Sequence, residues 1–313
     1  MAIRHAISLL VHEQVDVIVD QCLNFECFAP AALIMIHVSP SATFLRDTLV
    51  EALRRAGCGR SLVNPQSVRS AWGALSEAHL SNIRALEAHC DQDTIVSFHA
   101  SNDMLLRTLP DFPPGRTALF NEFEVSPHST WYTGRKFGQS AAFAALLDQL
   151  GCERACGSQI EGASYPYGLL RELAGKLDGK GDLLAALPDA SEEIIFSTWA
   201  RCHLGKPSRI PYVLFRSSRL LEAGAAVLPR PLRATGVTDI VQKAINRLEV
   251  RFASPLARAA DVESLILGRP ASGAQGRSAA GPVHYGIKRV ARVYDDPLRR
   301  RIRAHTLAQS APA

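Results

Sequence analysis

Two adjacent carboxylates, Glu192 and Glu193, stand at the start of a predicted helix, and Asp189 precedes Glu192 with the spacing of a capping box. In that motif Glu192 has a structural role, which leaves Glu193 as the candidate for chemistry. A carboxylate held on a rigid element at the edge of a cleft can remove a proton from a hydroxyl group. The alternative is that the helix dipole alone favours acids in this first turn. The same dipole stabilises the ionised carboxylate and makes it a weaker base.

Positive charge is concentrated in two segments of the second half of the chain. Residues 201–233 contain seven Lys and Arg residues against one acid, and residues 281–303 contain seven against two. Such local charge suits a phosphorylated ligand or an anionic membrane surface. The formal net charge is only +5, so the composition does not indicate nucleic-acid binding. Segment 268–282 is predicted to be a flexible loop, which could be a lid over a ligand or an idle linker.

Polar side chains follow three of the predicted strands. His12 follows the first strand, His37 and Ser39 end the second, and Asn102 and Asp103 follow the fourth. Ligands of open parallel sheets bind beyond the carboxyl ends of the strands, so these residues are candidates for a binding pocket. A histidine at a strand end can equally be a packed residue with no ligand.

The elements that must position these side chains alternate between strand and helix patterns. This alternation predicts an α/β fold with a mainly parallel central sheet and helices on both faces. Ser41 is the expected cap of the second helix and Gly57 its expected stop. Loops are expected over residues 110–138. The predicted strands are 6–11, 31–38, 61–64 and 94–99, and the predicted helices are 11–22, 41–57, 72–89, 169–177 and 189–202.

The motifs that the 313 residues lack argue against several classes of protein. The first strand is not followed by a glycine-rich dinucleotide fingerprint, and neither a phosphate-binding P-loop nor a GxSxG motif occurs. Seven cysteines, an odd number without a CxxC pair, predict reduced thiols and neither a disulfide framework nor a zinc site.

No apolar run approaches the ~20 residues of a membrane span. The start, MAIRHAISLLVHEQ, is interpreted as a first strand and not as a signal peptide, and we expect a cytoplasmic location.

Several segments, in order along the chain, resemble one family of transferases. The chain is similar to the core-2/I-branching β-1,6-N-acetylglucosaminyltransferase family, which also contains the peptide O-xylosyltransferases. The first strand and its His-containing turn match ISLLVHEQVDVIVDQC, the family's IHVD segment matches IMIHVSPSA, and its VxWGxxSxVxAxL helix matches VRSAWGALSEAHLSNIRAL. Its LSGxDYPL turn matches TIVSFHASNDMLLR, its GSQW element matches GSQIEGASYPYGLLREL, its PDExxxxT helix matches SEEIIFSTWA, and its late Lys element matches YGIKRV.

This resemblance implies a fold and a reaction. The family has a glycosyltransferase-A type α/β sandwich and transfers a sugar from a UDP donor with inversion. The core-2 type needs no divalent metal and holds the diphosphate with basic side chains. We therefore expect one domain, with a nucleotide-binding half in residues 1–108 and an acceptor-binding and catalytic half in residues 109–313. No cofactor or metal is expected beyond a UDP-sugar, and the resemblance implies UDP-N-acetylglucosamine or UDP-xylose.

The resemblance also implies roles for individual residues. Glu193 matches the family's catalytic base, with Thr198 at the matching distance, and Lys288 matches the late lysine that binds the diphosphate. Arg289 adjoins Lys288, and Arg216 or Arg209 could supply a further cation. The implied nucleotide-binding residues are His12, His37, Ser39, Asn102, Asp103, Lys288, Arg289 and Arg216, and the implied acceptor-binding residues are Ser158, Gln159, Glu161 and Trp131. For Trp131, core packing is the alternative.

The expected acceptor is a glycan or a lipid-linked glycan in the synthesis of a surface polysaccharide. The arginines near the chain's end would then hold the enzyme peripherally at the inner membrane face. No nucleic-acid partner is expected.

Two departures from the family keep other functions open. Ser39 stands where the family has Asp, and no Trp follows Gln159, so a non-catalytic module that binds nucleotide sugars or glycans is the alternative. A metal-dependent transferase that uses Asp91 and Asp93, or Asp103, is a third hypothesis. Asp91-Gln92-Asp93 precedes its strand, however, so we expect it at the wrong end of the sheet for the cleft.

Overall fold

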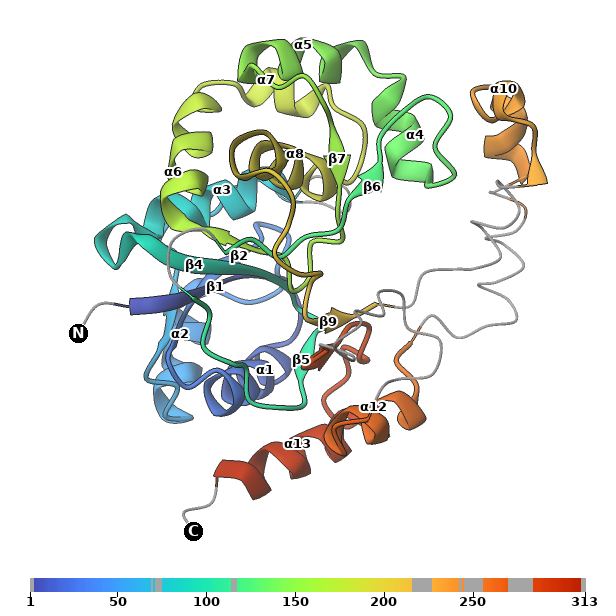
Figure 1. Cartoon of the computed structure of the whole chain (residues 1–313). Helices are drawn as coiled ribbons and strands as arrows, with labels where there is room; N and C mark the ends of the chain where they lie inside the picture. The colour runs from blue at the N-terminus through green and yellow to red at the C-terminus, as the bar shows by residue number, and fades with distance from the viewer. Residues whose placement is uncertain are drawn as a thin grey trace.

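The protein has a mixed α/β fold around a mainly parallel five-stranded sheet (Figure 1). The computed structural model describes residues 3–68, 70, 75–113, 117–215, 227–241, 244, 256–269 and 284–310. The sheet has the order β3-β2-β1-β4-β8, in which the first four strands are parallel and β8 is antiparallel to β4. The strands are β1 (Ile3–Val11), β2 (Ala32–Val38), β3 (Ser61–Val63), β4 (Cys90–Ala100) and β8 (Ser164–Pro166).

Helices cover both faces of this sheet. One face packs on α1 (Val15–Phe28) and α2 (Arg46–Arg55). The other packs on α3 (Ser76–Ala85), which continues into the short 3-10 helix η1 (Leu86–Ala88), and on α6 (Tyr167–Lys176) and α8 (Glu192–Leu204). Figure 1 shows these two layers below and above the sheet. The central strands are therefore buried on both sides, which explains their near-continuous apolar sequences.

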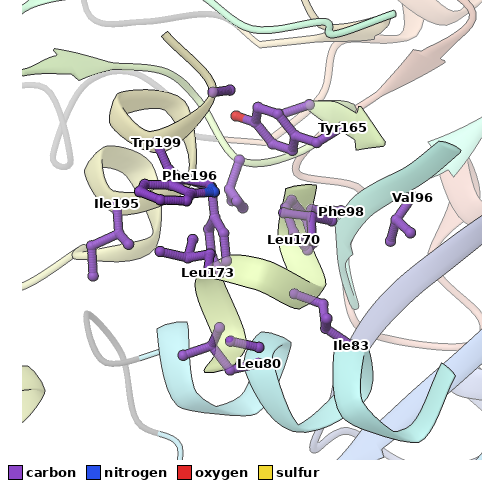
Figure 2. Close-up of a cluster of buried hydrophobic side chains, with 14 of the residues drawn as sticks. Leu80, Ile83, Val96, Phe98, Tyr165, Leu170, Leu173, Ile195, Phe196 and Trp199 are labelled. Atoms are coloured by element: carbon purple, nitrogen blue, oxygen red, sulfur yellow. The ribbon is translucent and has the colours of Figure 1, made fainter. Parts of the chain in front are cut away.

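Alternation of side chains along the strands divides the core into two clusters. Ile7 and Leu9 of β1 point to the side of α1, whereas Phe98 of β4 points to the side of α8. On that side the ring of Phe98 packs against that of Phe196, with centroids 4.6 Å apart and planes tilted by 39°, and Trp199 is fully buried beside them (Figure 2). This aromatic packing holds α8 against the sheet, and α8 is the helix that carries Glu193.

Two small sheets connect the later part of the chain to the end of β4. In one, β10 (Gly286–Ile287) lies between β5 (Met104–Leu105) and β9 (Val213–Leu214). In the other, β6 (Phe123–Glu124) pairs with β7 (Cys156–Gly157), which packs on α8. The register of β10 brings the following residue, Lys288, next to the segment that leaves β4. The remaining helices are α4 (Tyr132–Gly138), α5 (Ala141–Leu150), α7 (Gly181–Ala185), α10 (Arg230–Arg233), α12 (Ala259–Ile266) and α13 (Pro297–Ser310).

The last helix, α13, is held against α1 by a buried ion pair. Arg299 Nη1 lies 2.8 Å from Asp20 Oδ2, and Arg303 lies 3.6 Å from the other carboxylate oxygen. Burial raises the pKa of Asp20, while the two guanidinium groups lower it. The segment that runs from β10 to α13 is thus fixed at both ends, by the small sheet and by this ion pair.

The predicted strands are confirmed in number and order within the first hundred residues, with ends that shift by a few residues.

Two predicted helix caps are wrong. The second helix begins at Arg46, preceded by Leu45, because the Ser41 hydroxyl pairs with Ser39 Oγ at 2.8 Å. Asp189 does not cap α8 either, because Ala190 takes a left-handed φ of 66° and the helix begins at Glu192.

The predicted helix over 72–89 is seen from Ser76, and Trp72 lies outside the described residues. Within the described part of the chain, no helix combines the length and the apolar character needed to cross a bilayer.

Candidate functional site

Glu193 stands in the first turn of α8, at a point where three segments meet. Its backbone carbonyl accepts a hydrogen bond from Ser158 N at 2.8 Å, which ties α8 to the segment after β7. The preceding Ser191 hydroxyl bonds to Ser76 Oγ at 2.6 Å and ties the same turn to α3. Ala190, with its positive φ, makes the sharp entry into the helix. Non-glycine residues in this conformation are strained by roughly 1–3 kcal/mol and are frequent at functional sites.

The carboxyl group of Glu193 is only partly exposed and titrates far from its usual range. Burial raises the pKa of Glu193 to about 8; the Lys288 ammonium lowers it, the carboxyls of Glu161 and Glu192 raise it, and Thr133 lowers it. A group with a pKa near 8 can exchange a proton with a substrate close to neutral pH. Burial and the neighbouring acids therefore raise the pKa of Glu193 more than the helix dipole lowers it. Glu193 is a stronger base than its position at a helix start would suggest.

Glu192 is more deeply buried and has a structural partner. Its Oε2 accepts a hydrogen bond from the backbone N–H of Leu75 at 3.4 Å, at the start of α3. Burial raises the pKa of Glu192 to about 7, and this backbone hydrogen bond lowers it. The structural role predicted for Glu192 therefore involves α3 and not the cap of its own helix.

Lys288 interacts electrostatically with Glu193 and is paired with another acid. Its Nζ lies 2.5 Å from Glu161 Oε1, and only 17% of the lysine side chain is exposed. Burial lowers the pKa of Lys288, but Glu161, Asp103 and Glu193 together outweigh that effect and raise it. Lys288 is therefore a fixed positive charge among several carboxyl groups.

Phe215 provides an aromatic surface for Lys288 and its neighbour. Lys288 Nζ lies 4.9 Å from the ring centroid of Phe215, and Arg289 Cζ lies 4.8 Å from it. Arg289 has a φ of 69°, and together with Ala190 it makes up the described non-glycine residues with positive φ. Strained backbone thus occurs close to both Lys288 and Glu193. Arg289 directly follows Lys288, and Ala190 lies at the start of the turn that carries Glu193.

Asp103 follows the carboxyl end of β4 and is fully buried. Its Oδ2 accepts from the backbone N–H of Ala100 at 3.0 Å and lies 3.2 Å from His99 Nδ1. The other ring nitrogen of His99 lies 2.6 Å from the Tyr212 hydroxyl. Burial raises the pKa of Asp103; the hydrogen bond to His99 lowers it and Glu161 raises it. The carboxyl of Asp103 is thus positioned through a buried His–Tyr pair.

Two buried acceptor oxygens near Lys288, Asp103 Oδ1 and Glu161 Oε2, lack a hydrogen-bond partner among the described residues. Asn102 Oδ1, in the residue before Asp103, is a third such atom. The backbone carbonyl of Asn102 accepts from Val290 N at 2.9 Å. A buried acceptor without a partner costs about 1–3 kcal/mol, so a ligand that donates hydrogen bonds here would remove that penalty.

The turn after β1 contributes a second ion-pair network that the sequence analysis missed. Glu13 is buried and lies 2.8 Å from Arg292 Nε; its carboxylate also accepts from the Ser101 hydroxyl. His12 Nε2 lies 3.3 Å from Glu13 Oε1, and the His12 ring is about half exposed at 51%. The sequence feature that could have identified Glu13 is its position directly after His12, at the carboxyl end of a buried strand.

His37 and Ser39 lie at the end of β2, where local groups surround them. His37 is buried, and its Nε2 accepts from the backbone N–H of Val68 at 3.0 Å. Burial lowers the pKa of His37 to about 4, although the Val68 contact raises it. Ser39 is buried and bonded to Ser41. His37 is thus a neutral, packed histidine, and its contact with a nucleoside stays a prediction.

Among the acceptor candidates, Glu161 alone contacts Lys288. The Gln159 amide donates to the backbone carbonyls of Glu161 and Val213, at 2.9 and 2.8 Å, and so fixes the loop that carries Glu161. Ser158 is buried, and its hydroxyl donates to the Gln159 carbonyl at 2.8 Å. Trp131 is partly exposed and packs on Phe123 and over Gly157, where a Cβ atom would meet the indole ring at 2.1 Å.

Other predicted residues lie elsewhere. Asp91 and Asp93 stand at the amino end of β4, where Asp91 Oδ1 accepts from Thr94 N at 2.9 Å and from Asp93 N at 3.1 Å. They belong to the first residues of β4 and do not precede it, but they lie at the opposite end of the strand from Asp103, as predicted. Arg216 lies outside the described residues, and so does segment 270–283, which covers most of the predicted loop.

The raised pKa of Glu193 predicts a measurable dependence of stability on pH. The unfolded chain loses this proton near pH 4.5, whereas the folded protein keeps it up to about pH 8. The folded state therefore binds more protons in this window, and the free energy of unfolding falls as the pH rises, by at most about 1.4 kcal/mol per pH unit. Urea denaturation at pH 5 and pH 8 should show a smaller difference in Glu193→Gln than in the wild type. Equal differences in the two proteins would show that Glu193 keeps an ordinary pKa.

The arrangement joins a proton-exchanging carboxyl, a buried cation and unpartnered acceptors at the carboxyl end of the central strands. A carboxyl group with this pKa can exchange a proton near neutral pH, and a buried ammonium can stabilise an anion. No protein-family model matches the chain, and the search of curated proteins also gives no match.

Proposed function

We propose that the chain is an inverting, metal-independent glycosyltransferase that moves a sugar from a UDP-sugar to a hydroxyl group of a glycan, with Glu193 as the base. The α/β fold with its mainly parallel sheet agrees with a glycosyltransferase-A-like sandwich. The observation that carries the proposal is Glu193 itself: a partly buried carboxyl with a pKa of about 8 that interacts with the ammonium of Lys288. The sugar, GlcNAc or xylose, follows from the sequence resemblance.

In the proposed reaction, the acceptor hydroxyl attacks the anomeric carbon from the side opposite the leaving group. The Glu193 carboxylate takes the hydroxyl proton while the new carbon–oxygen bond forms. The bond between the anomeric carbon and the diphosphate oxygen breaks at the same time, and its electron pair stays on the diphosphate. A single displacement of this kind inverts the anomeric configuration. The base then carries the proton, which it releases to solvent before the next turnover.

Lys288 is the cation in position to stabilise the leaving group. The diphosphate gains negative charge as its bond breaks, and a preorganised ammonium in a site of low polarity stabilises that charge more strongly than water does. Because Lys288 is held by Glu161, it needs little reorganisation when the donor binds. Arg289, which shares the Phe215 ring with Lys288, is the nearest further cation along the chain.

The unpartnered oxygens of Asn102, Asp103 and Glu161 suit the sugar and not the diphosphate. Carboxylates and carbonyl oxygens accept hydrogen bonds, and a sugar ring presents several hydroxyl donors. An anionic phosphate close to Asp103 and Glu161 would instead be repelled unless these acids were protonated. We therefore place the transferred sugar over these three oxygens and the diphosphate on the side of Lys288 and Arg289.

A ligand screen followed by a turnover assay tests the proposal. UDP and UDP-GlcNAc or UDP-xylose should stabilise the protein against heat more than ADP and GDP do, by about 2.7 kcal/mol at a hundredfold excess over Kd. Incubation with the preferred UDP-sugar, without acceptor and in EDTA, should release UDP slowly, because water can replace the acceptor hydroxyl. A protein that is stabilised by none of these nucleotides, or that releases UDP only when manganese is added, would contradict the proposal.

The departures from the family at Ser39 and after Gln159 favour a second candidate, a non-catalytic module that binds nucleotide sugars or glycans. The same two assays separate the functions, since such a module would be stabilised by the UDP-sugar and would release no UDP from it at any pH.

A further inference from the structure

Three side chains that bind soft divalent cations come together at the end of α8 that is remote from Glu193. They are Cys152, Cys202 and His203, and one potential ligand atom from each lies within 4.8 Å of the other two. Cys152 is buried, whereas Cys202 and His203 are exposed. The sequence did not predict this cluster, because Cys152 and Cys202 are 50 residues apart and form no CxxC motif.

The position of Cys152 is fixed by the turn that ends α5. Gly151 follows the helix in the left-handed conformation, with a φ of 69°. The N–H of Cys152 donates to Leu147 O at 3.0 Å and that of Gly151 to Asp148 O at 3.1 Å, which is the Schellman pattern. Cys202 Sγ lies 3.7 Å from Gly151 O, directly against this turn. The two thiols are thus brought together by backbone structure on both sides.

The ring of His203 is held by Trp199, one helical turn earlier. The ring centroids of the two residues are 3.7 Å apart. Trp199 is fully buried, and its Nε1 donates to Leu169 O at 3.0 Å, so it provides a fixed surface for the imidazole. Outer contacts that orient a histidine in this way raise the affinity of a metal site.

We propose that Cys152, Cys202 and His203 form a binding site for a thiolate-preferring divalent cation, with Zn²⁺ as the best fit. Zn²⁺ takes two thiolates and one imidazole at about 2.0–2.3 Å in tetrahedral geometry, and a water molecule can fill the fourth position. Ligand atoms already within 4.8 Å of one another need only side-chain rotation to reach that geometry. Mg²⁺ and Ca²⁺ prefer oxygen ligands and do not suit this set.

Metal binding at this site has a structural consequence for α8. The ion would join the last turn of α8 to the turn after α5, which already meet through contacts of Cys202 with Gly151 and Cys152. Cys202 lies nine residues after Glu193, about 14 Å along the helix axis, so the ion is too remote to contact the proposed reaction. Burial raises the pKa of Cys152 to about 12, with a further increase from Cys202, so binding must displace a proton from Cys152.

Cobalt substitution tests the proposal directly. The reduced, metal-free chain is titrated with Co²⁺ and then with Zn²⁺, and the wild type should bind one ion with the absorption bands of a tetrahedral cobalt–thiolate centre, which Zn²⁺ then displaces. Cys202→Ser and His203→Ala should each weaken binding by at least ~100-fold, since loss of an outer-shell group alone weakens metal sites by 10–100-fold. Both substituted residues are exposed, so the variants should fold.

Cys27→Ser is the matched control, because Cys27 is a partly buried thiol of α1 that belongs to no such cluster in the described part of the chain. It should bind Co²⁺ as the wild type does. Three results would overturn the proposal. They are a cobalt spectrum without thiolate bands, equal affinity in wild type and Cys202→Ser, and loss of Co²⁺ binding in Cys27→Ser. Turnover of UDP-sugars is not used in this test, so its outcome is separate from that of the proposed function.

Discussion

Replacement of Glu193 by glutamine is expected to lower the release of UDP from the donor sugar by about a thousandfold, within the 10²–10⁴ range of general-base catalysis. Glutamine has nearly the same shape and can keep the contacts around the first turn of α8, but it cannot accept the proton. Binding of UDP should remain within about threefold of the wild type, because the substitution removes no positive charge. The measurements are initial rates of UDP release and the Kd of UDP by calorimetry.

Glu192→Gln is the matched control for this substitution. The change in charge and size is identical and occurs one residue earlier on the same helix, but Glu192 is buried and bonded to Leu75 N. A glutamine oxygen can accept that hydrogen bond, so turnover should fall by less than about tenfold. If Glu192→Gln lost as much activity as Glu193→Gln, the loss would reflect the field of the acid cluster and not a specific base.

Replacement of Lys288 by methionine is expected to lower kcat by about 10²–10³-fold, because the leaving diphosphate loses its preorganised cation. The same substitution should destabilise the fold by about 3–5 kcal/mol, since the buried carboxylate of Glu161 is left without its partner. Steady-state kinetics measures the first effect and urea denaturation the second. The two effects have different causes, so a second substitution can separate them.

In the double variant Lys288→Met with Glu161→Gln, no unpaired charge remains at this position. Stability should return to within about 1–2 kcal/mol of the wild type, while turnover stays low. Arg301→Met is the control, because Arg301 forms an exposed ion pair with Glu263 and such pairs contribute less than about 1 kcal/mol. Recovery of turnover together with stability in the double variant would mean that Lys288 acts only on the fold.

The sequence predicted the scaffold of the site because scaffold signals are local. Buried parallel strands appear as apolar runs, so β1, β2 and β4 and their shared carboxyl ends could be located from residue types alone. Glu193 was singled out by the resemblance of its helix to the family's PDExxxxT element, because an acid at a helix start is by itself explained by the helix dipole. The caps at Ser41 and Asp189 were wrong because tertiary hydrogen bonds and the left-handed Ala190 override local capping preference.

The pairings inside the site could not be predicted, because they join residues far apart in the chain. Lys288 meets Glu161 only through the register of β10 beside β5 and β9, strands of two residues each that have no periodic pattern. The contact between His99 and Tyr212 depends on the same small sheet. Raised pKa values follow from burial, which a sequence gives only as a tendency.

The dependence of kcat/KM on pH is the sharpest test of Glu193 as the base, because it reports the ionisation of groups in the free enzyme. For the wild type with a UDP-sugar, we expect kcat/KM to rise tenfold per pH unit through neutrality and to level off near pH 8, the pKa of Glu193. The small residual rate of Glu193→Gln should lack this rise. A wild-type profile that is already level at pH 6, or a rise that persists in Glu193→Gln, would contradict the assignment of Glu193 as the base.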